Sequence, residues 1–216
     1  MEKKEIKYYS LAALFMLATT VAGLGYYYYS HQKEEQASQK LSLLNQEATK
    51  TEEEEAQKHL ARRYLNLYRT YPNTKAGRTA CFRAGGIYYG LKHYKKVIET
   101  LQGCPPFTEQ TTAVFECQRQ KMLGEAYRDQ KEYEQAIACY TKATAGDWGM
   151  QGVYLEELAE TYRALYEEQK KIKYLQEGIK ALKKACATYP SHERFGKWMK
   201  KKEQFARKLK HISNKG

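Results

Sequence analysis

Histidine, cysteine and paired carboxylates are the side chains most often used for catalysis, and this chain of 216 residues arranges none of them as an active site. The histidines stand alone, without an acid or a nucleophile at helical spacing: His31, His59, His93, His192 and His211. No glycine-rich loop of the kind that binds phosphate is present. The sequence therefore predicts a protein that is not an enzyme and that needs no cofactor or metal ion.

The cysteines are dispersed along the chain: Cys81, Cys104, Cys117, Cys139 and Cys186. Their spacing is not that of a zinc site, and no paired histidines accompany them. Burial as small apolar side chains is the first interpretation, because Cys81 and Cys104 fall at packing positions. The alternative is a disulfide between Cys104 and Cys117, which flank a Pro105-Pro106 linker.

The segment from Leu123 to Ala143 predicts two antiparallel helices that pack on each other. Large and small side chains recur at helical spacing, and polar residues 130–132 separate the two halves. Large residues fill the space between the helices, and small ones stand where the backbones approach closely. The large residues are Leu123, Tyr127 and Tyr140, and the small ones are Gly124, Ala136 and Ala143.

This hairpin pattern recurs before and after the segment. Thirty-nine residues upstream, Gly85 and Tyr94 stand where Gly124 and Tyr133 stand. Downstream, the first half returns around Tyr162, and the second half follows after seven additional residues. Because seven residues are about two helical turns, we expect the third hairpin to be elongated.

A half copy precedes the others, as the second helix of a further hairpin. Its first helix is expected around residues 36–50, where the apolar stripe is weak. A tyrosine-proline pair ends this second helix and the last one, as expected of a residue that cannot continue a helix. Leu60, Tyr64, Leu67 and Pro72 repeat the spacing of Gly178, Leu182, Ala185 and Pro190.

The repeated pattern resembles the tetratricopeptide repeat, whose period is about 34 residues. The resemblance implies an all-α array of three to four hairpins over residues 30–190 that binds proteins or extended peptides. In this family the first helix of each hairpin lines a concave binding face, and Tyr89, Arg128 and Arg163 then form a row suited to a peptide. A merely solvated face is the alternative. The predicted face comprises Phe82, Arg83, Tyr89, Lys121, Glu125, Arg128, Glu156, Glu160 and Arg163.

The N-terminal region predicts a transmembrane helix over residues 11–29. Residues 11–25 carry no charge, and tyrosines bracket them like an aromatic belt. The uncharged span from Tyr8 to Ser30 has 23 residues, enough for the roughly 20 that cross a bilayer. Lysines in residues 1–10 favour a cytoplasmic N-terminus. A cleaved signal peptide is the alternative, since it has the same general composition.

The C-terminal residues 191–216 predict a basic capping helix. The net charge of the chain is +12, and the nine basic and two acidic residues of positions 193–216 give +7 of it. An apolar stripe suits a helix that covers the open face of the last hairpin, and binding to anionic lipid is the alternative. The stripe consists of Phe195, Trp198, Met199, Phe205, Leu209 and Ile212.

The whole arrangement resembles the bacterial ancillary subunit of the Sec translocon. The resemblance rests on the short basic start, the apolar segment ending in aromatics, Ser30-His31-Gln32, and Gly146-Asp147-Trp148 between the last two copies. It implies a single-pass protein of the inner membrane whose periplasmic domain hands exported proteins from the translocon to chaperones, with no nucleic acid as partner. A structural scaffold of a cell-envelope complex is the alternative function.

Overall fold

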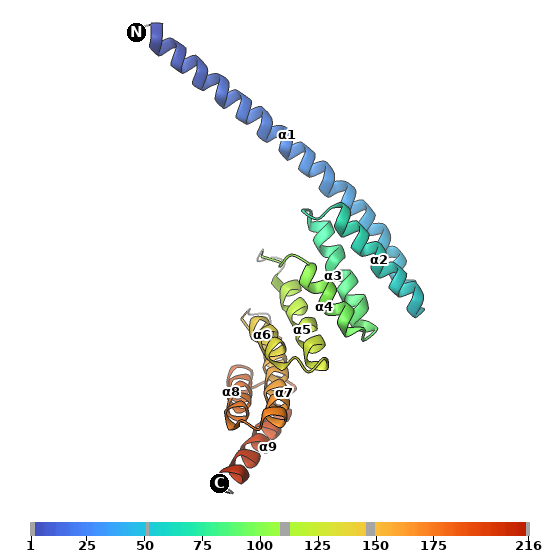
Figure 1. Cartoon of the computed structure of the whole chain (residues 1–216), viewed down its shortest axis with the longest axis vertical. Helices are drawn as coiled ribbons and strands as arrows, with labels where there is room; N and C mark the ends of the chain where they lie inside the picture. The colour runs from blue at the N-terminus through green and yellow to red at the C-terminus, as the bar shows by residue number, and fades with distance from the viewer. Residues whose placement is uncertain (1–2, 51, 109–112, 146–149, 215–216) are drawn as a thin grey trace. The chain divides into compact units, whose positions relative to one another are not determined.

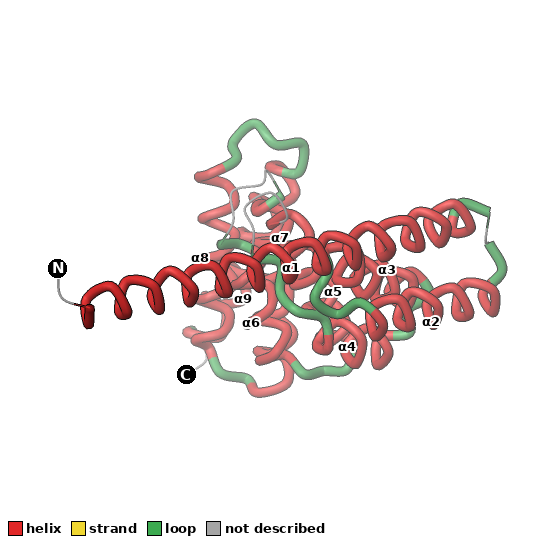
Figure 2. The backbone as a smooth tube through the Cα atoms, turned by 90° about the horizontal axis from the view of Figure 1, so that it is seen from above, coloured by secondary structure: helices red, strands yellow, loops and turns green. Residues whose placement is uncertain are grey.

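The computed structural model describes residues 3–50, 52–108, 113–145 and 150–214, with side chains from residue 14 onward. These residues form helices joined by short loops, without a strand, so the all-α prediction is confirmed for them (Figure 1, Figure 2). Gly146-Asp147-Trp148 lies outside the described residues. The helices are α1 (Lys3–Ala48), α2 (Glu54–Thr70), α3 (Lys75–Gly90), α4 (Tyr94–Gly103), α5 (Ala113–Asp129), α6 (Tyr133–Ala143), α7 (Gln151–Gln169), α8 (Ile172–Thr188) and α9 (Phe195–Ser213).

The chain divides into two compact units, Met1–Cys81 and Phe82–Gly216, with the boundary inside α3. In the first unit the C-terminal half of α1 packs on α2. The face of α2 predicted from the half copy is the buried one, and it includes Leu60, Tyr64 and Leu67. Tyr64 also donates a 2.8 Å hydrogen bond to the side chain of Asn45 on α1. The predicted pairing of these two helices is confirmed.

The same unit fixes the start of α3 through a carboxylate. Glu34 of α1 accepts hydrogen bonds from the backbone nitrogens of Lys75 at 2.7 Å and Ala76 at 3.0 Å. These two N–H groups have no partner within their own helix, and the negative charge suits the positive end of the helix dipole. Glu34 therefore acts as the cap of α3, supplied from a distant part of the sequence.

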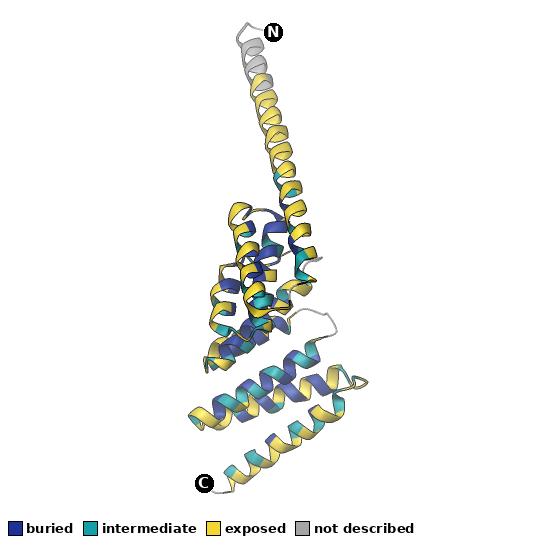
Figure 3. Ribbon diagram, turned by 90° about the vertical axis from the view of Figure 1, so that its right-hand side faces the viewer, coloured by how far each residue is buried: buried dark blue, intermediate teal, exposed yellow. Residues whose placement is uncertain are grey.

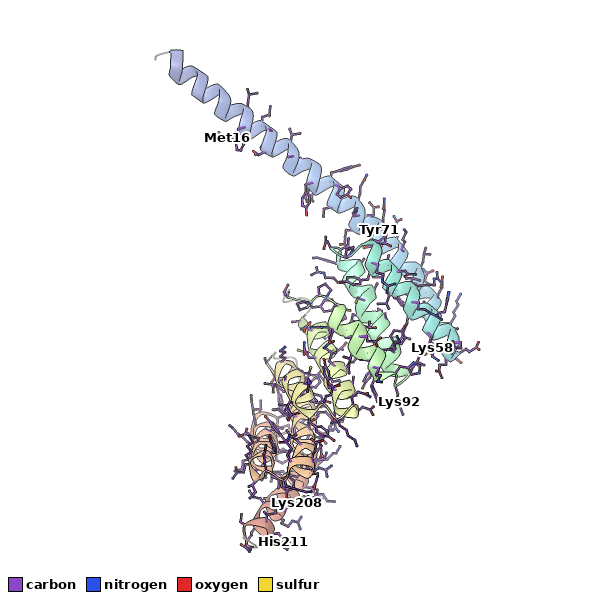
Figure 4. All side chains as sticks on the ribbon, viewed as in Figure 1. Met16, Lys58, Tyr71, Lys92, Lys208 and His211 are labelled. Carbon is purple, nitrogen blue, oxygen red and sulfur yellow. The ribbon has the colours of Figure 1, made fainter. Side chains whose placement is uncertain are left out.

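The prediction of a membrane-spanning helix over residues 11–29 is wrong. No helix in the described ranges is both long enough and apolar enough to cross a membrane. Within the uncharged span the apolar residues are confined to positions 11–25, a run short of the roughly 20 residues required. Threonines and glycines reduce the apolar character of this run, and the residues that extend it to 23 are mainly tyrosines. Helix α1 instead continues without a break to Ala48, and residues 14–29, including Met16, have exposed side chains (Figure 3, Figure 4). The periplasmic location inferred with that helix stays a prediction from sequence.

The second unit contains hairpins that repeat every 39 residues. The turns between their helices place Lys92, Lys131 and Lys170 in the left-handed region, with φ of 58°, 61° and 55°. The first two turns have the same backbone hydrogen bonds. The lysine N–H donates to the carbonyl oxygen three residues before it at 3.0 Å. The N–H of the residue after the lysine donates at 2.9 Å to the carbonyl oxygen of the tyrosine that lies five residues before that donor. This is the Schellman motif. In the third turn the Lys170 nitrogen instead donates a 2.7 Å hydrogen bond to the Tyr166 carbonyl, four residues back.

This register corrects the prediction of an elongated third hairpin. Tyr166, not Tyr162, occupies the place of Tyr127, because it stands four residues before the left-handed lysine in both cases. The first buried residue of the second helix also falls 39 residues apart, at Val97, Ala136 and Leu175. The third hairpin therefore has no insertion at its turn. Its second helix, α8, is longer than α6 only at its C-terminal end.

The two tyrosine-proline pairs end their helices in the same way. Tyr71 after α2 has φ −131° and ψ 57°, and Tyr189 after α8 has φ −130° and ψ 61°. Each tyrosine N–H donates a 3.0 Å hydrogen bond to the backbone carbonyl four residues before it. Each ring then reaches the first helix of its hairpin, where Tyr71 bonds Gln36 at 3.4 Å and Tyr189 bonds Gln151. The half copy thus ends like a full copy.

The disulfide considered between Cys104 and Cys117 is not formed, because Cys117 is a free thiol. Cys139 and Cys186 are free as well, and all three are buried. Burial raises the pKa of each of these thiols, which keeps them protonated and unreactive. Cys81 and Cys104 are buried as predicted, although neither is a free thiol.

Helix α9, named the cap below, packs on the last hairpin. Trp198 and Phe205 are both buried and stand seven residues apart, which is about two turns of the helix. The remaining residues of the apolar stripe are half-buried. A β-carbon on Gly152 of α7 would stand 2.3 Å from the Trp198 ring, and one on Gly178 of α8 would stand 3.0 Å from Phe205. Glycines at these two positions therefore allow α9 to lie against both helices of the hairpin.

Candidate functional site

The predicted binding face begins with a polar group that joins α3 to α5. Lys121 donates a 3.0 Å hydrogen bond to the Tyr89 hydroxyl and forms a 3.0 Å ion pair with Glu125 one turn further along α5. The Tyr89 hydroxyl in turn donates to Glu125, and the Lys121 ammonium lies 5.1 Å from the centroid of the Tyr89 ring. These three predicted residues are therefore in mutual contact.

Burial and mutual bonding change the acid-base behaviour of this group. Burial and the hydrogen bond to Glu125 raise the pKa of Tyr89 above its usual value. Burial alone would lower the pKa of Lys121, but its bonds to Tyr89 and Glu125 outweigh that effect and raise it. At neutral pH the phenol is thus neutral and the ammonium is charged. The group can recognise a partner by hydrogen bonding without a proton transfer.

Arg128 provides the corresponding link between α5 and α7. Its guanidinium forms a 2.5 Å ion pair with Glu157, a residue that the sequence did not single out. The guanidinium carbon also lies 5.8 Å from the centroid of the Tyr140 ring on α6. Both Arg128 and Glu157 are partly exposed, so this pair stays open to solvent on one side. Arg128 thereby connects three helices of two hairpins.

Glu160 and Arg163 lie further along the face, towards α9. They form a 2.8 Å ion pair on α7, and Lys201 of α9 pairs with Glu160 at 2.7 Å. Burial would raise the pKa of Glu160, but the hydrogen bonds from Lys201 and Arg163 lower it. In the 39-residue register Glu167, rather than Arg163, is the equivalent of Tyr89 and Arg128. Arg163 is therefore not part of the row that the sequence suggests.

Glu156, which the sequence placed on the face, lies instead beneath α9. Its side chain is 1 % exposed, and the Trp198 indole nitrogen donates to it at 3.0 Å. Arg194, Lys197 and Lys201 approach the same carboxylate at 3.1, 2.9 and 2.7 Å. Burial would raise the pKa of Glu156, but these donors outweigh it and lower the value to about 2. The residue holds the cap in place and does not face a partner.

Phe82 and Arg83 lie apart from the polar group. Phe82 is buried in an aromatic cluster with Phe107 and Phe115, at centroid distances of 5.8 and 5.5 Å. Arg83 is exposed on α3. Of the predicted face, the structure thus brings together Tyr89, Lys121 and Glu125 in one group and Glu160 and Arg163 in another.

The sequence missed two residues that complete the face, Glu157 and Tyr140. The sequence gives no signal for Glu157, because its pairing with Arg128 depends on how one hairpin is displaced along the next. The sequence pattern places Tyr140 at a packing position and gives no sign that its ring also lies beside the Arg128 guanidinium. No group of three or more His, Cys, Asp or Glu residues that could hold a metal occurs among the described residues.

No protein-family model and no curated protein sequence matches the chain. Among solved structures, the chain is similar to the crystal structure of MamA, with a TM-score of 0.45 and 17% sequence identity. The similarity covers 80% of this chain and 97% of the MamA chain. A likeness of this strength is too weak to assign a fold or a function.

Proposed function

We propose that the chain is a protein-interaction adaptor that binds extended peptide segments along the first helices of its hairpins. The observation that carries this proposal is the 39-residue register, with Lys92, Lys131 and Lys170 at equivalent turns. This register places the polar side chains of Tyr89, Arg128 and Glu167 at equivalent positions of α3, α5 and α7 in the second unit. A regular row of hydrogen-bonding groups on rigid helices suits an extended main chain, which presents its own polar groups at regular intervals.

The face combines both charges in nearly equal number, which supports a peptide of mixed composition. Lys121 and Arg128 are balanced by Glu125 and Glu157, and each cation is already paired with an anion. A strongly charged ligand would be repelled by one member of each pair, whereas a neutral main chain would not be.

The test selects peptides of 12 residues from a random displayed library on the wild-type chain and measures their affinity by fluorescence polarisation. Arg83→Ala and Lys121→Ala remove two side chains of the face, and Lys183→Ala removes an exposed lysine of α8 as the matched control. We expect the first two variants to weaken binding at least about fivefold and the control to leave it unchanged. Equal affinities for all four proteins would contradict the proposal.

A finer function, transfer of exported proteins beside the Sec translocon, is supported only by the sequence resemblance. Crosslinking in intact cells followed by mass spectrometry tests it. Translocon subunits among the crosslinked proteins would support this role, and their absence would remove it while leaving the adaptor proposal in place.

A structural scaffold is the second candidate, and the charge of α8 and α9 favours it. Residues 170–214 contain fourteen Lys or Arg and three Glu, a net charge of +11. Several of these cations pair with α7, but Lys183, Lys184, Lys200 and Arg207 are exposed. A surface of this kind suits an acidic partner protein. Loss of partner proteins after exchange of these four residues for Gln, with peptide binding retained, would favour the scaffold.

A further inference from the structure

Two buried side-chain oxygens of the described part of the second unit have no hydrogen-bond partner, Gln120 Oε1 and the Tyr140 hydroxyl. Tyr140 of α6 is fully buried, and within the described ranges no donor or acceptor lies within hydrogen-bonding distance of its hydroxyl. Burying a hydroxyl without a partner is costly, so such groups are uncommon in folded proteins.

Packing does not require this hydroxyl. The 39-residue register places Leu101 and Ile179, both apolar, at the positions equivalent to Tyr140 in the neighbouring hairpins. The Tyr140 ring itself fills the space above Gly124, where a β-carbon would stand 2.9 Å from the ring carbon that bears the hydroxyl. The ring therefore explains the packing, and the oxygen needs another explanation.

The hydroxyl lies beneath the polar face. Gly124 precedes Glu125 and stands one turn before Arg128, so the end of the Tyr140 ring lies beside these two residues. The charges of Arg128, Glu125 and Glu157 and the phenol of Tyr89 all act on it, while burial raises the pKa of Tyr140 far above its usual value. The hydroxyl thus remains protonated and is available as a donor.

We propose that the Tyr140 hydroxyl donates a hydrogen bond to a main-chain carbonyl oxygen of a bound peptide, at a position that Arg128 covers in the free chain. The inference rests on the proposed peptide-binding function and identifies what the central part of the face recognises. A neutral carbonyl fits this position better than a carboxylate does, because Glu125 and Glu157 lie close by and would repel a second negative charge.

Arg128 is able to act as a movable cover. Its side chain is 30% exposed and is held by Glu157 from the next hairpin. Surface ion pairs of this kind contribute little to stability, so a peptide can displace the guanidinium without disturbing the helices. Recognition of a main-chain carbonyl also does not depend on the side chains of the partner, which suits an adaptor with several partners.

The test compares two variants that each remove one buried tyrosine hydroxyl. Tyr140→Phe removes the unpaired hydroxyl, and Tyr127→Phe removes a hydroxyl that Gln102 bonds in the free chain. The probes are the synthetic peptides selected on the wild-type chain. We expect Tyr140→Phe to bind them about fivefold more weakly, with an unchanged or higher urea midpoint. Tyr127→Phe is expected to lower the midpoint and leave the affinity unchanged.

The outcomes separate this inference from the proposed function. If Lys121→Ala weakens binding and Tyr140→Phe does not, the peptide face stands and the Tyr140 contact is wrong, as expected if the hydroxyl serves only a bound water. A lower urea midpoint for Tyr140→Phe would also overturn the inference, since the hydroxyl would then have a structural partner. If neither Lys121→Ala nor Tyr140→Phe affects binding, both proposals fail.

Discussion

The ring of Trp198 lies so close to Gly152 that a β-carbon on residue 152 would stand 2.3 Å from ring carbon Cη2. This contact brings α9 against the start of α7, and it allows the indole nitrogen to reach Glu156. Figure 4 shows the far end of the same helix, where Lys208 and His211 lie, and Lys208 pairs there with Glu167 of α7. The cap is thus attached to α7 along its length.

Gly152→Ala is expected to destabilise the cap. The fully buried Trp198 ring has no room to move, so the added methyl group forces a shift that costs about 1–3 kcal/mol in the free energy of unfolding. Urea unfolding followed by tryptophan fluorescence measures this change. Gly196→Ala is the control, since a β-carbon there meets nothing within 4 Å, and it should not destabilise the chain. Equal stabilities for the two variants would contradict the close contact.

Two adjacent glycines of α3 are expected to respond in opposite directions. A β-carbon on Gly85 would stand 2.2 Å from Leu101, whereas one on Gly86 meets nothing within 4 Å. Gly85→Ala should therefore lower the free energy of unfolding by about 1–3 kcal/mol. Gly86→Ala should raise it by about 0.5–1 kcal/mol, because alanine is the better helix former. The two unfolding curves, measured side by side, should lie on either side of the wild-type curve.

The Glu156 carboxylate predicts a loss of stability in acid. Its pKa is about 2 in the folded chain against 4.5 for an ordinary glutamate, so its contribution is complete above about pH 5. The contribution falls as the pH decreases from about 4.5 towards 2, and it is of the order of 3 kcal/mol. The free energy of unfolding of wild type and Glu156→Gln, measured from pH 2 to 7, should therefore differ at neutral pH and converge near pH 2.

A variant of an exposed carboxylate provides the control for this profile. Glu203 lies exposed on α9, and Glu203→Gln should follow the wild-type curve within about 0.5 kcal/mol at every pH. If Glu156→Gln also followed the wild-type curve at every pH, the buried carboxylate would not hold the cap.

Lys131→Gly is expected to stabilise the second hairpin. Lys131 has φ 61°, a conformation that is strained for a side chain and unstrained for glycine, so the exchange should gain about 0.5–1 kcal/mol. Differential scanning calorimetry would show the gain as a higher melting temperature. Ala138→Gly changes an exposed residue in the interior of α6 and should instead cost about 1 kcal/mol. A lower melting temperature for Lys131→Gly would contradict the assigned turn.

The hairpins and their helix ends could be predicted because glycine, alanine and proline occupy positions where the backbone itself requires them. The register of the third hairpin could not be predicted in the same way. Tyr162 and Tyr166 are one helical turn apart and share a face, so spacing alone does not distinguish them. The left-handed turn residues are lysines, which give no signal of the kind that glycine gives.

The face itself was predicted only in part. Pairs within one helix, such as Lys121 with Glu125, follow from the four-residue spacing. Pairs between helices, such as Arg128 with Glu157, depend on how one hairpin is displaced along the next, which the sequence does not specify. Glu156 was misplaced because its burial depends on α9, more than 40 residues further along the chain.

The most direct test of the central claim is the position at which a bound peptide contacts the chain. A photoreactive benzoylphenylalanine is introduced at position 83 or 163 on the face, or at exposed positions 183 or 207 of α8 and α9. The bound peptides selected on the wild-type chain are then crosslinked and identified by mass spectrometry. The account predicts crosslinks from positions 83 and 163 and none from 183 and 207. Crosslinks from 183 and 207 alone would contradict it.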